Sequence, residues 1–218
     1  MATKALPDSD DDSPGLQRNL DKVLDSIEVD AAKRVLPKVA TAKAWQAVIM
    51  AGLDVGNPIY VGRFRGDRGL ERVGVEVDGA PGAMPWEVAK ALKDFEKTLQ
   101  NIVAGLDAKY PDAESLDDDG MEAVIEIAAW AHAEWVRIHP FANGNGRTAR
   151  IWANLLLMRY GLPDVVSLRP RPGGEYGAAG AAAMKGDWVP TMRLFRSLVR
   201  EAVSGAPAKS AAKKAKPP

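Results

Sequence analysis

Two helical patterns, separated by one short helix-breaking segment, constrain the fold of this chain more than any other feature. Over residues 120–138, apolar side chains recur at every third or fourth position, which predicts a helix with one buried face. The pattern ends at His139-Pro140, because proline disfavours helical backbone in the residue before it. It resumes over residues 148–160. The chain is therefore predicted to hold a loop between two packed helices.

The spacing of apolar residues predicts further helices on both sides of this loop. Pro37 is expected to kink or divide the second of them, and Asp187 is expected to cap the last. The expected ranges are 16–28, 31–51, 86–107 (opened by Pro85), 174–185 and 188–204. The residues of the second range expected in the core are Val35, Val39, Trp45, Val48 and Ile49.

Residues 56–85 have a different character. Glycines recur there, and the stretches IYVGRF and ERVGVEV alternate in the manner of strands. The sequence DGAPG then supplies turn residues, so a β-hairpin or extended flap is expected at about 72–84. The predicted fold class is all-α with a small β-hairpin flap.

Both ends are expected to be disordered tails around one domain at 16–204. Residues 1–15 are acidic and contain two prolines, while residues 205–218 hold four lysines among alanine and proline. A lysine-rich end is also compatible with contact to nucleic acid or an anionic surface, although composition favours a solvated tail.

Composition excludes several classes of function. Lys plus Arg and Asp plus Glu number 29 each, so bulk charge indicates neither a nucleic-acid nor a membrane partner. The absence of cysteine excludes disulfides, thiolate zinc sites and a cysteine nucleophile. The first residues lack the apolar core of a secretory signal, and no apolar run reaches 18 residues. These features are expected of a cytoplasmic protein.

The loop between the two main helices suits an anion. In residues 143–146, NGNG, the backbone can adopt conformations that point successive N–H groups into one concavity. The helix that follows adds unpaired N–H groups and a favourable dipole. Arg147 and Arg150 in its first turn cost roughly 0.3–1 kcal/mol each unless something negative lies nearby. A phosphate chain is the obvious candidate.

His139 lies a few residues before this cradle, and its ordinary pKa near 6.5 suits a general base. The other histidine, His132, is interpreted as structural, because the pair lacks the spacing of a zinc site. A glycine–asparagine turn or a lone histidine can each have a purely structural explanation. Histidine, cradle and two arginines within twelve residues favour phosphate binding.

Taken whole, HPFANGNGRTAR resembles the signature HPFx[D/E]GNGRxxR of the Fic (Fido) family, and the likeness extends over about residues 40–200. The resemblance implies a mainly helical fold and a nucleotidyltransferase that moves AMP from ATP to a protein Ser, Thr or Tyr hydroxyl (AMPylation). The matching residues are His139, Pro140, Phe141, Gly144, Asn145, Gly146, Arg147 and Arg150.

The resemblance also implies a role for each residue. His139 would deprotonate the target hydroxyl, and a buried Phe141 would anchor the loop. Backbone and side-chain donors of the cradle would hold the phosphates, and two arginines would neutralise the β- and γ-phosphates: Gly144, Asn145, Gly146, Arg147 and Arg150. An extended target segment would pair with the flap at Val75, Glu76, Val77, Asp78 and Gly79.

Asn143 departs from the signature, where an acid binds Mg²⁺. Three interpretations stay open. The protein binds Mg²⁺ mostly through the triphosphate, with the Asn143 carbonyl as a neutral ligand. It uses another donor, transferring a different nucleotide, phosphate or phosphocholine. Or it is a degenerate, non-catalytic nucleotide-binding module.

The sequence carries a weaker signal for regulation than for the site itself. Ser197–Glu201 partly matches the family's inhibitory motif [S/T]xxxE[G/N], whose glutamate pairs with the second arginine, here Arg150. The alternatives are a separate inhibitor protein or no inhibition. Tyr176 is expected to line a base pocket, although aromatic packing explains it equally well.

Overall fold

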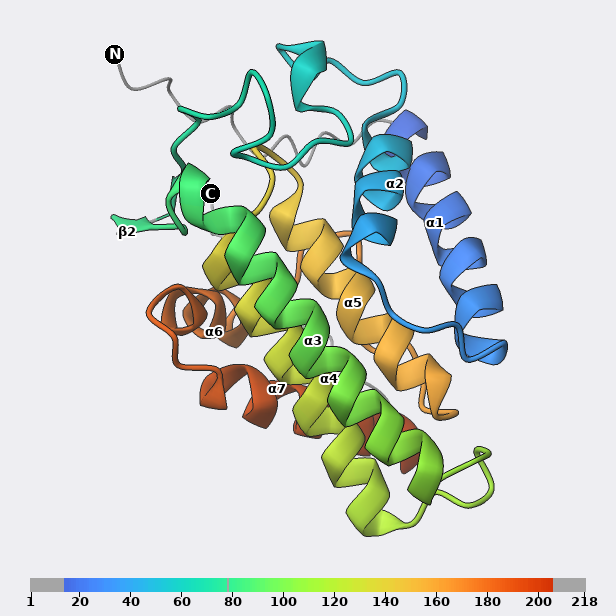
Figure 1. Ribbon diagram of the computed structural model, residues 1–218. Helices are drawn as coiled ribbons and strands as arrows, with labels where there is room; N and C mark the ends of the chain where they lie inside the picture. The colour runs from blue at the N-terminus through green and yellow to red at the C-terminus, as the bar shows by residue number, and fades with distance from the viewer. Residues whose placement is uncertain (1–13, 78, 206–218) are drawn as a thin grey trace, which may run out of the picture.

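The computed structural model describes residues 14–77 and 79–205, and helices make up most of that part (Figure 1). The helices are α1 (Pro14–Ala32), α2 (Val39–Met50), α3 (Pro85–Lys109), α4 (Asp118–Ile138), α5 (Asn145–Arg159), α6 (Glu175–Met184) and α7 (Val189–Val203). A 3₁₀ turn, η1 (Pro58–Tyr60), precedes a hairpin of β1 (Glu76–Val77) and β2 (Ala80–Pro81). The predicted all-α class with a small hairpin is confirmed.

The predicted tails lie almost entirely outside the described residues, and α1 begins at Pro14, two residues before the predicted start of the domain. Within the described ranges, no helix is long and apolar enough to cross a membrane.

α5 is the central helix of the fold (Figure 1). It packs against α4, α1 and α2, and all of its residues except Gly146 and Met158 are buried. A helix covered on every side has little freedom to rotate or shift. The first two turns of α5, which carry the two arginines of the motif, are therefore held by the core itself.

An aromatic cluster joins the helices around α5. The ring of Trp152 on α5 lies 4.7 Å from that of Trp45 on α2 and 5.7 Å from that of Phe95 on α3, centroid to centroid. Trp135 on α4 lies 5.7 Å from Trp152 and 5.4 Å from Phe95. Most of these pairs meet edge to face, the arrangement that aromatic quadrupoles favour.

The predicted helix over 31–51 is wrong at its start. α1 continues to Ala32, and Arg34 then adopts a left-handed backbone with φ 48° before α2 begins at Val39. Val35 lies in the intervening linker and is 45% exposed, so its assignment to the core is wrong, as is that of Val48 at 37%. The other three residues expected there are buried or pack against the core: Val39, Trp45 and Ile49.

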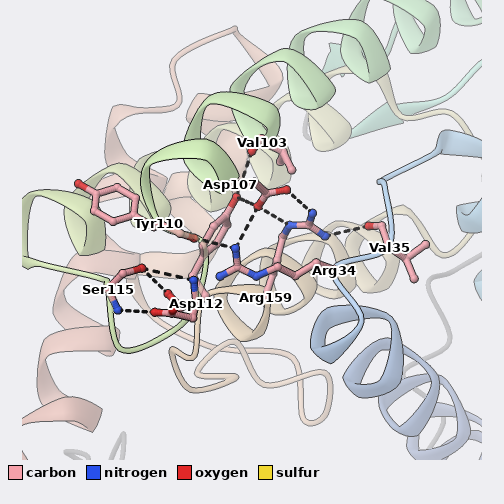
Figure 2. A network of polar contacts seen from close by, with 9 residues as sticks. Arg34, Val35, Val103, Asp107, Tyr110, Asp112, Ser115 and Arg159 are labelled. Atoms are coloured by element: carbon pink, nitrogen blue, oxygen red, sulfur yellow. Dashed lines mark hydrogen bonds and ion pairs between the residues drawn. The ribbon is translucent and has the colours of Figure 1, made fainter.

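A polar network joins the last turns of α3 and α5 to the linker after α1 (Figure 2). Asp107 on α3 receives hydrogen bonds from Arg159 at 2.5 and 3.2 Å and from the Tyr160 hydroxyl at 2.9 Å. Arg159 also donates to the Val35 carbonyl, and Arg34 lies 3.6 Å from Asp107. Burial opposes the charge on Asp107, but these hydrogen bonds and the two guanidinium charges hold its pKa below the ordinary value.

Candidate active site

His139 terminates α4 in a left-handed conformation, with φ 52° and ψ 57°. Its N–H still donates to the Trp135 carbonyl at 2.9 Å, and Pro140 follows. A positive φ is uncommon for a side chain with a Cβ, although histidine tolerates it better than most residues. This one residue turns the chain from the helix into the loop and sets the direction of the imidazole.

The hydrogen bond of the imidazole defines its tautomer. Nδ1 lies 3.0 Å from the Val136 carbonyl, which can only accept. Nδ1 therefore carries the hydrogen of the neutral ring, and Nε2 carries the lone pair. His139 is thus arranged as a proton acceptor through Nε2.

The loop after His139 is closed by the side chain of Asn145. Its Oδ1 accepts from the Phe141 N–H at 2.8 Å, and its Nδ2 donates to the Phe141 carbonyl at 2.9 Å. Phe141 itself is fully buried, 4.8 Å from the Phe64 ring, which is the expected anchor. The Asn145 amide thus holds the loop, and the residue also lines the cavity, so its role as a phosphate donor stays a prediction.

Gly144 forms the N-cap of α5 with φ 89°, a conformation that glycine adopts at low cost. A Cβ there would also lie 2.8 Å from Cε of Met50. α5 begins at Asn145, three residues before the predicted start at 148, so the backbone of the GNG sequence is itself the N-terminus of the helix. The first N–H groups of a helix lack partners within it, and its dipole favours an anion at this end.

Two polar residues that the motif does not single out fix the loop from behind. The Thr148 hydroxyl accepts from Nε1 of Trp135 at 2.8 Å and lies 3.0 Å from the Gly144 carbonyl, to which it donates. Nε2 of Gln46, on α2, donates to the Asn143 carbonyl at 3.3 Å. Gln46 and Thr148 are buried polar residues, and their place in otherwise apolar helix faces is the only sequence signal of this role.

A cavity of about 370 Å³ opens over the loop, within the size range of small-ligand sites. Its walls come from the hairpin, the end of α4, the loop, the first turn of α5, and α6. It brings together most of the predicted site residues: Val75, Glu76, Val77, His139, Asn143, Gly144, Asn145, Gly146 and Arg150, with His132, Val136, Ala142, Arg171, Tyr176, Gly177, Gly180, Ala181 and Met184 completing the lining.

The two motif arginines have different environments. Arg150 lines the cavity, whereas Arg147 is buried, with 3% of its surface exposed, and does not line it. The cavity lining thus supports the expected phosphate-facing position of Arg150, while that of Arg147 stays a prediction.

Arg150 is oriented by neutral partners. Its Nη2 donates to the Leu168 carbonyl at 3.1 Å and its Nη1 to the Tyr176 hydroxyl at 3.4 Å. That hydroxyl lies 2.7 Å from Nε2 of His132 and is placed to donate to it. Burial, with the Arg150 charge in addition, lowers the pKa of His132 to about 3, so this histidine is neutral. His132, which was expected to be structural, and Tyr176, which was expected to line the cavity, thus belong to one hydrogen-bond network with Arg150.

The hairpin lies where the flap was expected. Glu76 pairs with Pro81 and Val77 with Ala80, and the Gly82 N–H donates to the Val75 carbonyl at 3.1 Å. Val75, Glu76 and Val77 face the cavity, whereas Gly79, with φ 78°, does not line it. Asp78 is outside the described residues.

The residues near Asn143 do not form a magnesium site by themselves. Asn143 offers one neutral amide oxygen, and Glu76 is the carboxylate on the cavity wall. In the described part of the chain, no three His, Asp or Glu side chains gather as metal ligands would. Magnesium is usually held by one or two carboxylates together with substrate phosphates.

The possible inhibitory segment lies away from the cavity. Glu201 accepts from the Ser197 hydroxyl at 3.2 Å, and the neighbouring Arg200 pairs with Glu122 at 2.6 Å, near the start of α4. His132, which shares Tyr176 with Arg150, lies about 15 Å further along α4 at the helical rise per residue. Glu201 thus does not pair with Arg150, which removes the structural basis for inhibition by Ser197–Glu201.

The profile of the Fic/DOC family matches residues 38–157, more than half of the chain and all of the loop. The chain belongs to the Fic/DOC family. It is 45% identical over 80 residues to protein adenylyltransferase fic-1 of Caenorhabditis briggsae, which is 36% of this chain and 16% of that protein. It is 42% identical over 110 residues to protein adenylyltransferase Fic of Aedes aegypti, covering 50% of this chain and 18% of the relative. The chain thus spans less than a fifth of either relative.

Solved structures show the same fold. Fic-1 (residues 134–508) of Caenorhabditis elegans superposes with a TM-score of 0.65 at 24% identity, covering 93% of this chain and 53% of that one. BepC of Bartonella tribocorum, solved with bound AMPPNP, gives a TM-score of 0.55 at 20% identity, covering 84% of this Fic/DOC chain and 85% of BepC.

Proposed function

We propose that this chain is a protein adenylyltransferase that transfers AMP from ATP to a hydroxyl group of a target protein. One observation carries the proposal: the His139 side chain and the first residues of α5 line the same cavity, together with Arg150. A proton acceptor and an anion site thus lie side by side, as attack of a hydroxyl on a phosphate requires. The relatives named protein adenylyltransferase, and the AMPPNP bound to BepC, support the choice of donor.

The reaction follows from the tautomer of His139. Nε2 accepts the proton of a target Ser, Thr or Tyr hydroxyl as its oxygen attacks the α-phosphorus. The new bond joins that oxygen to phosphorus, and the bond from the α-phosphorus to the α–β bridging oxygen breaks. Pyrophosphate leaves with the bonding electrons.

The phosphates are held mainly by backbone. The N–H groups of Gly144, Asn145 and Gly146 begin α5 and lie on the cavity wall, so they are positioned to receive phosphate oxygens. Arg150 stabilises the negative charge that grows on the departing pyrophosphate. Arg147 follows directly after Gly146 and is buried, and it adds a second positive charge to this end of α5.

The flap supplies the target-docking edge. Val75, Glu76 and Val77 border the cavity, and β1 and β2 pair only with each other among the described strands. An extended target segment can add to this short hairpin through main-chain hydrogen bonds, which set register without requiring one sequence. Gly79 belongs to the same proposed edge, and Asp78, outside the described residues, is included in it from the sequence alone.

Asn143 has two consequences for the proposal. If ATP is the donor, Mg²⁺ would be held chiefly by the nucleotide, because the protein offers no carboxylate at this position, and the steps above use only the chain's own groups. The missing carboxylate also favours a second candidate, in which the donor is different. Transfer of another nucleotide, phosphate or phosphocholine is the second candidate, and a nucleotide-binding module without catalysis is the remaining class.

A separate protein that presents a carboxylate to Arg150 is the proposed form of inhibition, since Glu201 does not do so.

The decisive experiment uses the position of the label. The full chain is incubated in a cell extract with ATP labelled at the α- or the γ-phosphate, or with labelled CDP-choline, each with and without Mg²⁺, and labelled proteins are identified by intact mass. Label from α but not γ, with the mass of an adenylyl group (AMP less one water) added, is the expected result. Label from γ, or from CDP-choline, would support the second candidate, and bound nucleotide without label would support the binding module.

A variant of the proposed base, compared with a control variant, completes the test. His139→Ala should lower labelling by about 10²–10⁴-fold while nucleotide affinity stays the same, because a general base contributes about that factor. Tyr110→Phe is the control, since its hydroxyl bonds Asp117 at the far end of α4 and the residue does not line the cavity. Equal labelling by His139→Ala and the wild-type chain would contradict the proposal.

A further inference from the structure

Arg65 lies between η1 and the hairpin, and its buried guanidinium binds four backbone carbonyls. Nε donates to the carbonyl of His139 at 2.7 Å, and Nη2 donates to those of Ile138 at 2.9 Å and Ala83 at 2.8 Å. Nη1 donates to the Val73 carbonyl at 3.3 Å. The residue is only 2% exposed, so these bonds are shielded from water.

The four carbonyls belong to two structures that are far apart in sequence. Val73 and Ala83 are the two roots of the hairpin, just outside the pair formed by Val75 and Gly82. Ile138 and His139 are the end of α4, where carbonyls have no partner within the helix. One side chain therefore ties both roots of the flap to the residue proposed as the general base.

Backbone bonds parallel to this link are few. The Ala83 N–H donates to the Ile138 carbonyl at 3.2 Å, and the Arg65 N–H donates to the Pro140 carbonyl at 2.7 Å. The hairpin itself has only two residues in each strand, which is too short to be stable alone. The orientation of the flap thus depends strongly on the guanidinium.

The acceptors suit a charged arginine. No described acidic side chain pairs with Arg65, and burial lowers its pKa to about 10, so the group is still protonated at neutral pH. The carbonyls at the C-terminal end of α4 carry the negative end of the helix dipole, which favours a cation there. Lysine cannot replace this arrangement, because a single ammonium lacks the planar fork that reaches several acceptors at once.

We propose that Arg65 is a positioning residue that fixes the distance and angle between the target-docking flap and His139. The proposal rests on the proposed function, and it adds to that function the means by which the target hydroxyl is aligned with the base. Arg65 does not line the cavity, so it contacts neither nucleotide nor target and acts only through the flap and the end of α4.

The test separates alignment from nucleotide binding. Arg65→Lys keeps the buried charge, and Arg65→Gln keeps planar donors without the charge. Each is expected to lower kcat/KM for labelling of the acceptor protein found with the wild-type chain by about 100-fold, the cost of a misplacement of about 1 Å. The Kd for AMPPNP should change by no more than about twofold, because the cradle and Arg150 are untouched.

Arg63 offers a matched control. It lies two residues earlier and donates to the carbonyl of Arg68 in its own loop, with no bond to the flap roots or to α4. Arg63→Lys and Arg63→Gln are expected to label at the wild-type rate. Wild-type labelling by Arg65→Gln, or a loss of AMPPNP affinity as large as the loss of labelling, would overturn the proposal.

Amide hydrogen exchange provides a readout that does not need activity. In the Arg65 variants, the Ala83 and Gly82 amides should exchange at least about tenfold faster, while those in α7 keep their wild-type rates. If neither variant folds, the wild-type chain decides: the Ala83 and His139 amides should have the same protection factor, because the flap and the end of α4 open together. Independent exchange of these two amides overturns the link.

The two proposals fail in different ways. If the wild-type chain labels no protein, the proposed function fails, yet the exchange rates still show whether Arg65 holds the flap to α4. If labelling occurs and the Arg65 variants match their Arg63 controls in rate and exchange, the function stands and the role of Arg65 is wrong.

Discussion

Gly82 packs against His139 so closely that a methyl group has no room between them. A Cβ added to Gly82 would lie 2.8 Å from the Cβ of His139 and 2.9 Å from Cγ2 of Val75. Real Cβ atoms do not approach other atoms so closely, so the flap or the histidine must move to admit one. The absence of a side chain at Gly82 therefore lets the flap rest on the proposed base.

We expect Gly82→Ala to lower target labelling by at least about tenfold, because even a displacement below 1 Å misaligns the hydroxyl and Nε2. AMPPNP affinity should stay within about twofold of wild type. Gly74→Ala is the control, since a Cβ at Gly74 meets no atom within 4 Å and the residue has no positive φ. Initial rates with α-labelled ATP measure the difference, and equal rates in the two variants would show that the contact is unimportant.

Tyr176→Phe should weaken binding of ATP about 2- to 12-fold, since it removes one hydrogen bond worth about 0.5–1.5 kcal/mol from the partners that orient Arg150. Binding of AMP should change less, because Arg150 is assigned to the outer phosphates. Calorimetry with both nucleotides measures the contrast. Tyr110→Phe removes a hydroxyl bonded to Asp117 at the far end of α4 and should leave both affinities unchanged.

Asn143→Asp should increase labelling in Mg²⁺ and leave the rate in EDTA unchanged or lower. A carboxylate at this place on the cavity wall adds an anionic ligand of the kind that magnesium prefers. Without the metal, the same charge repels the triphosphate. Rates across a magnesium titration measure the effect, and an Asn143→Asp variant that shows no greater metal dependence than wild type would contradict it.

The pH dependence of stability should reveal the buried neutral histidine. The pKa of His132 is near 6.5 in the unfolded chain and about 3 in the folded one, so only the unfolded state gains a proton as pH falls through this window. The stability is complete above pH 6.5 and is lost progressively below it. Between pH 7 and pH 5, the free energy of unfolding should fall by about 2 kcal/mol more in wild type than in His132→Gln. Denaturant titrations at several pH values measure this, and parallel pH profiles would exclude it.

The network of Figure 2 predicts a second loss of stability in acid, at lower pH than that of His132. Because the pKa of Asp107 is held below its ordinary value, its stabilisation is present above about pH 4 and is lost as pH falls through the depressed pKa. At pH 7, Asp107→Asn should destabilise the chain by about 1–3 kcal/mol, towards the lower end because Asp107 is 30% exposed. The difference should shrink below pH 4. Asp94→Asn, which breaks an exposed pair with Lys90, should have almost no effect.

The parts of the fold that could be predicted are those with local signals. The long apolar periodicities of α4 and α5, the break at His139-Pro140 and the turn chemistry of the hairpin all lie within short stretches. The left-handed backbone of Arg34 has no comparable signal, so the end of α1 could not be placed from sequence. The contacts that accompany the end of α1 are long-range: Arg34 and Arg159 both reach Asp107, which lies more than seventy residues after Arg34.

The candidate site shows the same division. The motif identifies His139, the cradle and the arginines, but spacing alone treats Arg147 and Arg150 as equivalent neighbours on a helix surface. They differ because α5 is enclosed on all sides, so residues three apart meet different parts of the core. Arg65 has no sequence signal since its partners are carbonyls, which every residue has, and its importance appears only when positions 73, 83, 138 and 139 meet in space.

The burial of α5 also bears on how such a protein can change over evolutionary time. Its first turn is the floor of the cavity and the rest is the centre of the core, so a substitution that alters the chemistry of this helix also endangers folding. The flap and the small residues of α6 line the same cavity but do not form the centre of the core. Substitutions in the flap and α6 are therefore the ones that can change the donor or the target protein while the first turns of α5 stay the same.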